Sequence, residues 1–215
     1  MKYAFYKQKL ILALGCFLGA GLLWNIQLRL EQNRLAQEIA PKILRFHVLA
    51  NSNSPEDQAL KLQVKSYLLE EIYAGMEETK TEWGKDDLTR YLAGQKEALE
   101  QKTEDFILSQ GKSYPVSLSL SSCEFPEKYY GDLRLPAGTY QAFNVTIGAG
   151  RGHNWWCVLY PKICITKDAL TVIPESSREE LQTILSQEDY QALLSERPVI
   201  HIDFRLRELL SRLLG

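Results

Sequence analysis

The sequence has no surplus of basic charge. It contains 25 Lys and Arg against 27 Asp and Glu, which gives a formal net charge of -2 at pH 7. Residues 1–24 hold three lysines and no acid, so removing them changes the charge from -2 to -5. Because binding to a phosphate backbone needs a basic face, this balance argues against nucleic acid as a partner.

The sequence also lacks internal repeats, low-complexity tracts and a familiar cofactor or metal motif. The glycine-rich stretch 148–152 precedes β-favouring residues 155–160, whereas a nucleotide fingerprint requires its glycines to open a helix. We therefore predict a flexible loop between two strands. His153 and Cys123, with Cys157 and Cys164, have the side chains of zinc ligands, but their spacing matches no familiar finger. We expect no metal, no cofactor and no small-molecule substrate.

One apolar segment stands near the N-terminus and is short for a membrane span. The uncharged run from Leu10 to Trp24 has 15 residues, where a spanning helix needs roughly 20 and a signal-peptide core about 7 to 15. Ile26 and Leu28 can lengthen this run. Residues 1–28 are therefore predicted to be a signal peptide or a signal-anchor helix, and both alternatives stay open. The residues expected in the membrane are Leu10, Leu14, Phe17, Leu22 and Trp24.

The charges around this segment predict its orientation. Three lysines precede it, and the charges that follow it balance, which places the N-terminus in the cytoplasm and the rest of the chain outside. Residues 29–41 are predicted to form a stalk helix that ends before Pro41, because proline disfavours helical geometry in the residue before it. Residues 42–215 are then one extracytoplasmic domain, and ordinary globular composition supports that count.

Two helices are predicted in the first half of this domain. Ser54 is a good N-cap, Pro55 fits the first helical position, and a stripe of apolar residues follows at steps of four. The stripe comprises Leu60, Val64, Leu68 and Ile72. A second helix, capped by Asp86 or Asp87 and ended by Gly111, has its own apolar positions. These are Leu88, Leu92, Leu99 and Phe106.

Strands are predicted where the apolar period changes to two. Residues 116–121 alternate between apolar residues and serine, residues 140–147 alternate similarly, and 43–50 is rich in β-branched and apolar residues. Residues 125–135 are read as a loop and 155–166 as two strands around Pro161. A helix over 177–195 with a break at 187–189, a strand over 199–202 and a helix over 204–214 complete the chain. Without regular βαβ alternation, the predicted class is α+β: a small, largely antiparallel sheet packed by helices, after an N-terminal membrane-crossing helix.

Cys157 and Cys164 are equidistant from Tyr160-Pro161. A hairpin turning there places them opposite each other, at a separation compatible with a disulfide outside the membrane. Two buried free thiols are the alternative. The remaining Cys123 is interpreted as a core residue at the end of a strand, and His47 and His201 as core or edge histidines.

Trp155 and Trp156 are adjacent on a predicted strand, so they point to opposite faces of the sheet. One can lie in the core, while an exposed one can anchor a protein partner. We therefore take Trp155 and Trp156, with the loop residues Arg151, His153 and Asn154, as candidates for partner binding; packing alone is the alternative. Cys157 and His153, with Asn154, also allow an exported thiol hydrolase as an alternative function.

Three stretches resemble one known family. They are Arg45–Ser54 with the following Glu56–Lys61, then Leu135–Tyr140, and then Gly148–Cys164 with its Asn-Trp-Trp-Cys-Val-Leu-Tyr-Pro run. Together they span most of residues 43–166. The chain resembles the stage II sporulation protein R family of endospore-forming Gram-positive bacteria.

The resemblance implies a non-enzymatic signal, and no catalytic residue is carried over from it. Family members are expected to be made in the forespore and exported to the space between the two sporulation membranes, anchored or secreted. There the protein is expected to trigger the membrane-embedded aspartic protease stage II sporulation protein GA, which activates sigma E by removing its pro-sequence. A structural protein of the envelope is a third class of function.

Overall fold

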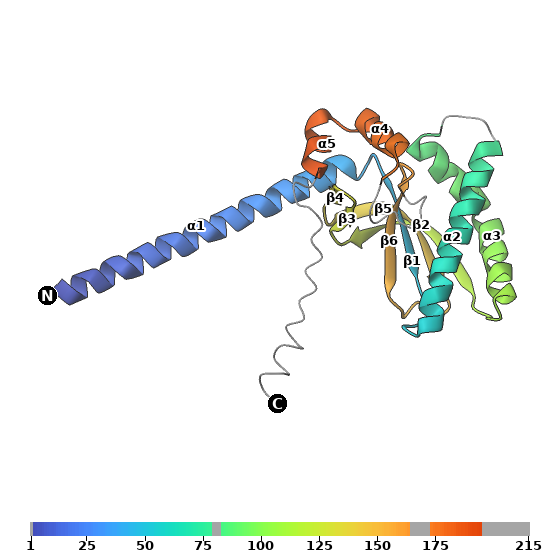
Figure 1. Cartoon of the computed structure of the whole chain (residues 1–215), viewed down its shortest axis with the longest axis horizontal. Coiled ribbons are helices and arrows are strands. Elements are labelled where there is room, and N and C mark those ends of the chain that lie inside the picture. Colours follow the sequence, from blue (N-terminus) through green and yellow to red (C-terminus); the bar gives the residue numbers. More distant parts are fainter. Residues whose placement is uncertain (1, 79–82, 164–172, 195–215) are drawn as a thin grey trace.

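A computed structural model of the chain describes residues 2–78, 83–163 and 173–194, with side chains from residue 15 onward (Figure 1). A long helix, α1 (Lys2–Ile39), projects from a domain in which α2 (Pro55–Glu78) and α3 (Lys85–Ser109) cover one face of a sheet. The shorter α4 (Glu175–Ile184) and α5 (Gln187–Leu193) lie near the last turns of α1. This mixture confirms the α+β class.

The helix α1 continues unbroken from the apolar segment into the domain. It ends at Ile39, two residues before Pro41, and its last turns are buried, with Leu35 at 8% and Ile39 at 0% exposure. Phe17, Leu22 and Trp24 are exposed, and the side chains of Leu10 and Leu14 lie outside the described ones. Within the described ranges, no helix combines the length and apolarity that crossing a membrane requires. Membrane contact by residues 1–28 stays a prediction.

The main sheet has four strands in the order β2-β5-β1-β6, and two of its three pairings are antiparallel. The strands are β1 (Leu44–Leu49), β2 (Val116–Phe125), β5 (Gly138–Ile147) and β6 (Asn154–Tyr160). The central pair, β1 with β5, is parallel. It can be parallel because the chain crosses over through α2, α3 and β2 between these two strands.

The core lies between this sheet and the two long helices. Phe46 on β1 stacks on Phe143 of β5, with ring centroids 6.0 Å apart. The predicted apolar stripe of α2 is buried, each of its four members at 4% exposure or less, and so are Leu88, Leu92 and Leu99 of α3. Phe106, the fourth predicted core position of α3, is only half-buried, and Ile107 is the buried residue at that turn. The periodicity of the sequence therefore identified the buried face of α2 and most of that of α3.

The beginnings of these two helices differ in how they are capped. At α2 the Ser54 hydroxyl accepts the N–H of Asp57 at 3.2 Å, which confirms Ser54 as the N-cap. At α3 the N-cap is Gly84, not Asp86 or Asp87. The Asp87 carboxylate instead accepts the N–H of Gly84 at 3.1 Å, because a residue at the third helical position can reach back to the cap. Gly111, with φ of 76°, follows the end of α3 as predicted.

The segment predicted as a loop over 125–135 contains a hairpin, so this prediction was wrong. It is formed by β3 (Lys128–Tyr130) and β4 (Leu133–Leu135), which pair antiparallel. Tyr130, Leu133 and Leu135 are each at most 1% exposed. Three-residue strands are too short for alternation to be recognised, and burial against the rest of the domain supplies their stability.

The C-terminal predictions are tested in part. The helix expected over 177–195 is present as α4 and α5, with the break at Leu185-Ser186 rather than at 187–189. Ser186 caps α5 by accepting the N–H of Asp189 at 3.0 Å. The strand predicted over 199–202, the helix over 204–214, His201 and most of the second strand expected after Pro161 lie outside the described residues.

The glycine-rich loop joins β5 to β6 and is bonded to the turn that follows β1. The side-chain Oδ1 of Asn51 accepts a hydrogen bond from the N–H of Ala149 at 2.9 Å, and its backbone carbonyl accepts one from the N–H of Arg151 at 3.1 Å. The Ala50 carbonyl accepts the N–H of Gly152 at 2.9 Å. The loop is thus a strand-to-strand connection, as expected, but several hydrogen bonds hold it in place.

Gly152 is required in this loop by space, which gives a first prediction. A Cβ atom there would lie 2.3 Å from the backbone oxygen of Ser52. We expect Gly152→Ala to lower the free energy of unfolding by about 1 to 3 kcal/mol, measured by urea denaturation. Gly94→Ala in α3 is the control, because nothing lies within 4 Å of its Cβ and alanine favours a helix. Equal stability of Gly152→Ala and wild type would contradict this account.

Candidate functional site

One half of the sheet face that points away from α2 and α3 carries partly exposed polar and aromatic side chains. We call this half the open face and define it by Ser119, Ser121, Asn144, His47, Asn154 and Trp156. Strand register brings these residues together, since His47 on β1 lies opposite Asn144 on β5 and Trp156 on β6. None of them belongs to the buried core.

His47 is held by two amide side chains. Its Nδ1 lies 3.2 Å from Oδ1 of Asn144, and its Nε2 lies 2.6 Å from Oδ1 of Asn154. The Asn144 amide is oriented by its NH₂ group, which donates to the Ala142 carbonyl at 3.2 Å and to Ser121 Oγ at 3.0 Å. Because the carbonyl can only accept, Asn144 presents its oxygen to the ring and Nδ1 of His47 donates.

The second ring nitrogen of His47 also faces an amide oxygen. Donation from both nitrogens requires the protonated, cationic ring, whereas a neutral ring requires the Asn154 amide to turn and present its NH₂ group. Trp156 stacks on the imidazole with ring centroids 4.0 Å apart and an interplanar angle of 7°.

The other half of this sheet face is covered, and Arg45 is buried there. The side chain is 0% exposed; its Nε donates to the Cys157 carbonyl at 3.1 Å and Nη2 to Tyr130 Oη at 3.2 Å. The guanidinium carbon lies 4.3 Å from the ring centroid of Phe125 and 5.1 Å from that of Tyr140. Burial lowers the pKa of Arg45 below its ordinary value, and no described residue accepts a hydrogen bond from Nη1.

Cys123 connects the covered half to the open face. Its thiol donates to Oδ1 of Asn144 at 3.4 Å, the same oxygen that faces His47. Burial raises the pKa of the Cys123 thiol, and the charge of Arg45 opposes that rise in part. A raised pKa keeps the sulfur protonated near neutral pH, which fits a hydrogen-bond donor better than a nucleophile.

The predicted partner-binding residues are distributed over both faces and the loop. Arg151, His153 and Asn154 are exposed, and Trp156 is part of the open face. Trp155 points to the helix side, where its ring meets Phe46 edge-on at 5.8 Å and the Lys65 ammonium lies 5.3 Å away. The opposite orientation of the two tryptophans follows the prediction, whereas their role in binding stays a prediction.

Cys157 is disulfide-bonded and 1% exposed, on the side of the sheet that packs on the helices. Cys164, its expected partner, lies outside the described residues. The bond leaves no thiol at Cys157 for the chemistry of a thiol hydrolase, and His153 is exposed in the loop. Across the described ranges, no cluster of three or more His, Cys, Asp or Glu side chains could hold a metal ion.

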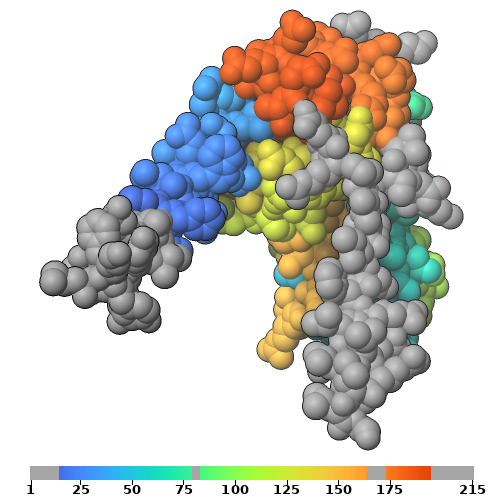
Figure 2. Space-filling model, turned by 60° about the vertical axis from the view of Figure 1, so that its left-hand side comes forward, coloured from blue at the N-terminus to red at the C-terminus, as the bar shows by residue number. Residues whose placement is uncertain are grey.

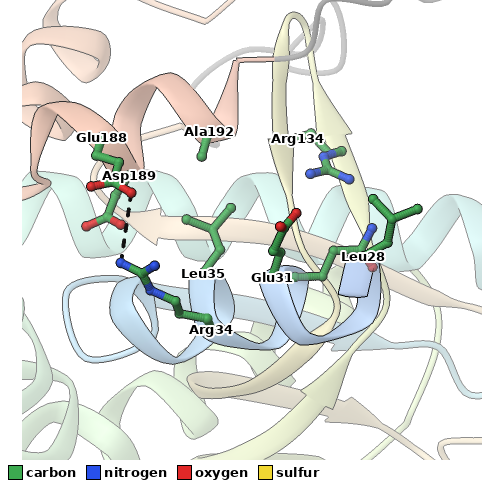
Figure 3. A pocket seen from close by; sticks show the side chains of 9 residues that line it. Leu28, Glu31, Arg34, Leu35, Arg134, Glu188, Asp189 and Ala192 are labelled. Carbon is green, nitrogen blue, oxygen red and sulfur yellow. Dashed lines mark ion pairs between the residues drawn. The ribbon is translucent and has the colours of Figure 1, made fainter. Parts of the chain in front are cut away.

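A separate cavity of about 360 Å³ lies where α1 meets the domain. Figure 3 shows side chains from α1, α5 and β4 around it, with Arg34 of α1 directed toward Glu188 of α5 at 3.9 Å. Lys42 forms a further ion pair with Asp189 at 3.7 Å. In the space-filling view the last turns of α1 pack against α5 (Figure 2). One ion pair joins α1, and the other joins the turn after α1, to the start of α5.

Sequence reasoning missed the network of the open face. The sequence indicates a core or edge position for His47 and a core position for Cys123, and it assigns no role to Arg45 and Asn144. Strand alternation indicates which residues share a face: His47 and Leu49 lie on one face of β1, and Asn154 and Trp156 lie on one face of β6. Only the order and register of the strands show that these two faces are the same face of the sheet.

Comparisons with known proteins agree with the motifs that resemble one family. The sequence model of a family described as stage II sporulation protein R matches residues 40–169. Stage II sporulation protein R of Bacillus subtilis (strain 168) is 32% identical over 131 residues, which are 59% of this chain and 55% of that relative. The match thus spans just over half of the relative's length. No solved structure matches the chain.

The protonated thiol of Cys123 gives a second prediction. At pH 8 we expect iodoacetamide to alkylate Cys123 about tenfold or more slowly in the folded protein than in urea, because burial lowers both access and the thiolate fraction. The folded rate should rise with pH beyond the range in which an ordinary thiol levels off. Peptide mapping by mass spectrometry measures the rate, and the protein unfolded in urea is the reference at each pH. Equal rates in the two states would refute the assignment.

Proposed function

The chain belongs to the stage II sporulation protein R family, and on that premise we propose that it is an exported signalling protein of sporulation. The proposed signal passes from the forespore to the intermembrane space. There the protein activates the membrane-embedded protease stage II sporulation protein GA, and through it the processing of pro-sigma E. The proposal includes no catalytic activity of the chain itself.

The open face is the observation that supports this proposal most. It combines a half-buried tryptophan, a hydrogen-bonded histidine and exposed serines on a rigid sheet. Such a surface suits protein contact, because aromatic side chains next to ordered polar groups contribute much of the energy of an interface. The strands that form it, β1, β2, β5 and β6, all lie within the region matched by the family.

We propose further that residues 1–28 direct export and that the domain then acts on the outer side of the membrane it has crossed, either anchored there or released. The burial of the last turns of α1 supports a short, stiff connection in the anchored case. From Leu28 to Ile39 an α-helix rises roughly 16 Å, at about 1.5 Å per residue. An anchored domain would therefore stay close to a membrane-embedded partner.

Reconstitution of the pathway tests the proposed function. Co-expression of the full chain with the protease and pro-sigma E in a non-sporulating host should yield processed sigma E, detected by immunoblot. Without the chain, processing should remain at background, because the protease then lacks its activating signal. A chain lacking residues 1–28 should fail to stimulate processing for want of export. Absence of processing when all three proteins are present and the chain is exported would contradict the proposal.

The adjacent tryptophans provide a matched pair of variants. Trp156→Ala should reduce processing about tenfold or more in a protein that still folds, because this ring lies on the open face. Its contacts with His47 and with Phe125, at 4.7 Å, mean that the thermal midpoint should fall as well. Trp155→Ala should instead lower the free energy of unfolding by roughly 2 to 4 kcal/mol, because this ring packs against Phe46. Immunoblots and thermal unfolding separate the two effects. If Trp156→Ala processed like wild type, the open face would lose its proposed role.

A further inference from the structure

The strand β2 forms one edge of the described sheet, and only part of that edge is covered. Its pairing with β5 is regular over ten residue pairs, from Val116 opposite Ile147 to Phe125 opposite Gly138. In an antiparallel pair the backbone groups of alternate residues point outward from the sheet. In β2 the backbone N–H and carbonyl groups of the even-numbered residues point outward, because the N–H groups of Val116 and Leu118 bond to side chains outside the sheet.

Two glutamates of α3 cover the first part of this edge. Glu104 accepts the backbone N–H of Val116 at 2.9 Å, and Glu100 accepts that of Leu118 at 2.7 Å. Four helical residues rise about 6.0 Å and two strand residues about 6.8 Å, so the side chains of successive helical turns match successive outward N–H groups. The carboxylates thus complete the hydrogen bonds of the edge where α3 runs beside it.

This pairing of α3 side chains with outward N–H groups of β2 ends one helical turn before Glu100. At that position stands Lys96, whose ammonium lies 3.4 Å from Oε1 of Glu100. An ammonium group has no acceptor, so it cannot satisfy the next outward N–H, that of Leu120. Among the described residues, none accepts a hydrogen bond from the outward N–H groups of Leu120, Ser122 and Glu124.

Apart from the charged Glu124 at its end, the uncovered part of the edge lacks the usual protection of an edge strand. Natural edges are blocked by proline, lysine, a bulge or a covering element. Residues 119–124 contain no proline and no lysine, their pairing with β5 has no register shift, and Ser119, Ser121 and Ser122 are exposed. Small exposed side chains also leave room for a neighbouring strand.

We propose that the edge of β2 at Ser119–Glu124 takes up an extended segment of the partner protein as an added strand. The inference rests on the proposed function, since it names how the activated partner is held. Backbone N–H and carbonyl groups of the added strand bond to the outward groups of Leu120, Ser122 and Glu124. The odd-numbered residues Ser119 and Ser121 belong to the open face, so an added strand lies directly beside that face.

The charges around the edge of β2 indicate which kind of partner segment would bind there. Carboxylates lie at both ends of the edge, with Glu104 beside the covered end and Glu124 at the far end, whereas Lys96 neutralises Glu100 between them. A hollow of about 400 Å³ continues from the covered end of the edge and is lined by Glu104 and Asp105, with no cation among its lining residues. The edge therefore fits an extended segment that carries a lysine or arginine at the end nearest to this hollow.

A proline at Ser122 tests the proposal. It removes an outward N–H without removing any bond to β5, a position at which edge strands tolerate proline. In the co-expression assay with the full chain, Ser122→Pro should reduce pro-sigma E processing about tenfold or more. Ser122→Ala, which keeps the N–H, should process within about twofold of wild type. Thermal unfolding of both purified variants checks that the fold is retained.

Hydrogen exchange tests the edge without substitution. Adding the detergent-solubilised protease to the full wild-type chain should slow exchange in a peptide covering 118–124, and leave a reference peptide in the centre of α2 unchanged. Processing by Ser122→Pro equal to that of wild type, or unchanged exchange at 118–124 in the presence of an activated protease, would overturn the added strand alone. If wild type stimulates no processing, the proposed function fails and the inference fails with it.

Discussion

Asn51 joins three parts of the chain through its side chain and its backbone carbonyl, and the arrangement of the sheet depends on these bonds. Its Oδ1 accepts the N–H of Ala149, and its side-chain NH₂ group donates to Asp57 at 2.8 Å. Its backbone carbonyl accepts the N–H of Arg151. Ser52 donates to the same Asp57 oxygen at 2.5 Å, and this bond is the main reason that the pKa of Asp57 lies below its ordinary value. The end of β1, the start of α2 and the loop before β6 are thereby fixed to one another.

This connection determines which residues meet across the sheet. With the loop fixed to the end of β1, β6 returns along β1 with Asn154 opposite Leu49 and Trp156 opposite His47. A shift of one residue would move every side chain of β6 to the other face. Two of the three stretches that resemble the family, around Asn51 and around the tryptophans, are therefore bonded to each other in the structure.

The two faces of the sheet serve different purposes. The face toward α2 and α3 is sealed by apolar side chains, whereas the opposite face is covered by the β3–β4 hairpin in one half and left partly open in the other. Among the described residues no carboxylate pairs with Arg45 at the covered half, and aromatic rings with two hydrogen bonds offset part of the cost of its burial. An ordered polar surface beside a rigid core suits recognition by another protein, which is the role we propose.

The sequence by itself determined the local elements: the N-cap at Ser54, the buried stripe of α2, the alternation of β2 and the opposite orientations of Trp155 and Trp156. Each of these depends on residues a few positions apart, where helical and strand geometry act directly. Only the tertiary structure decided the burial of Arg45, the hairpin at β3–β4 and the bonding of His47 to Asn144 and Asn154. The bonded residues of the His47 network lie 97 and 107 positions apart, so strand order and register, which local patterns do not encode, had to bring them together.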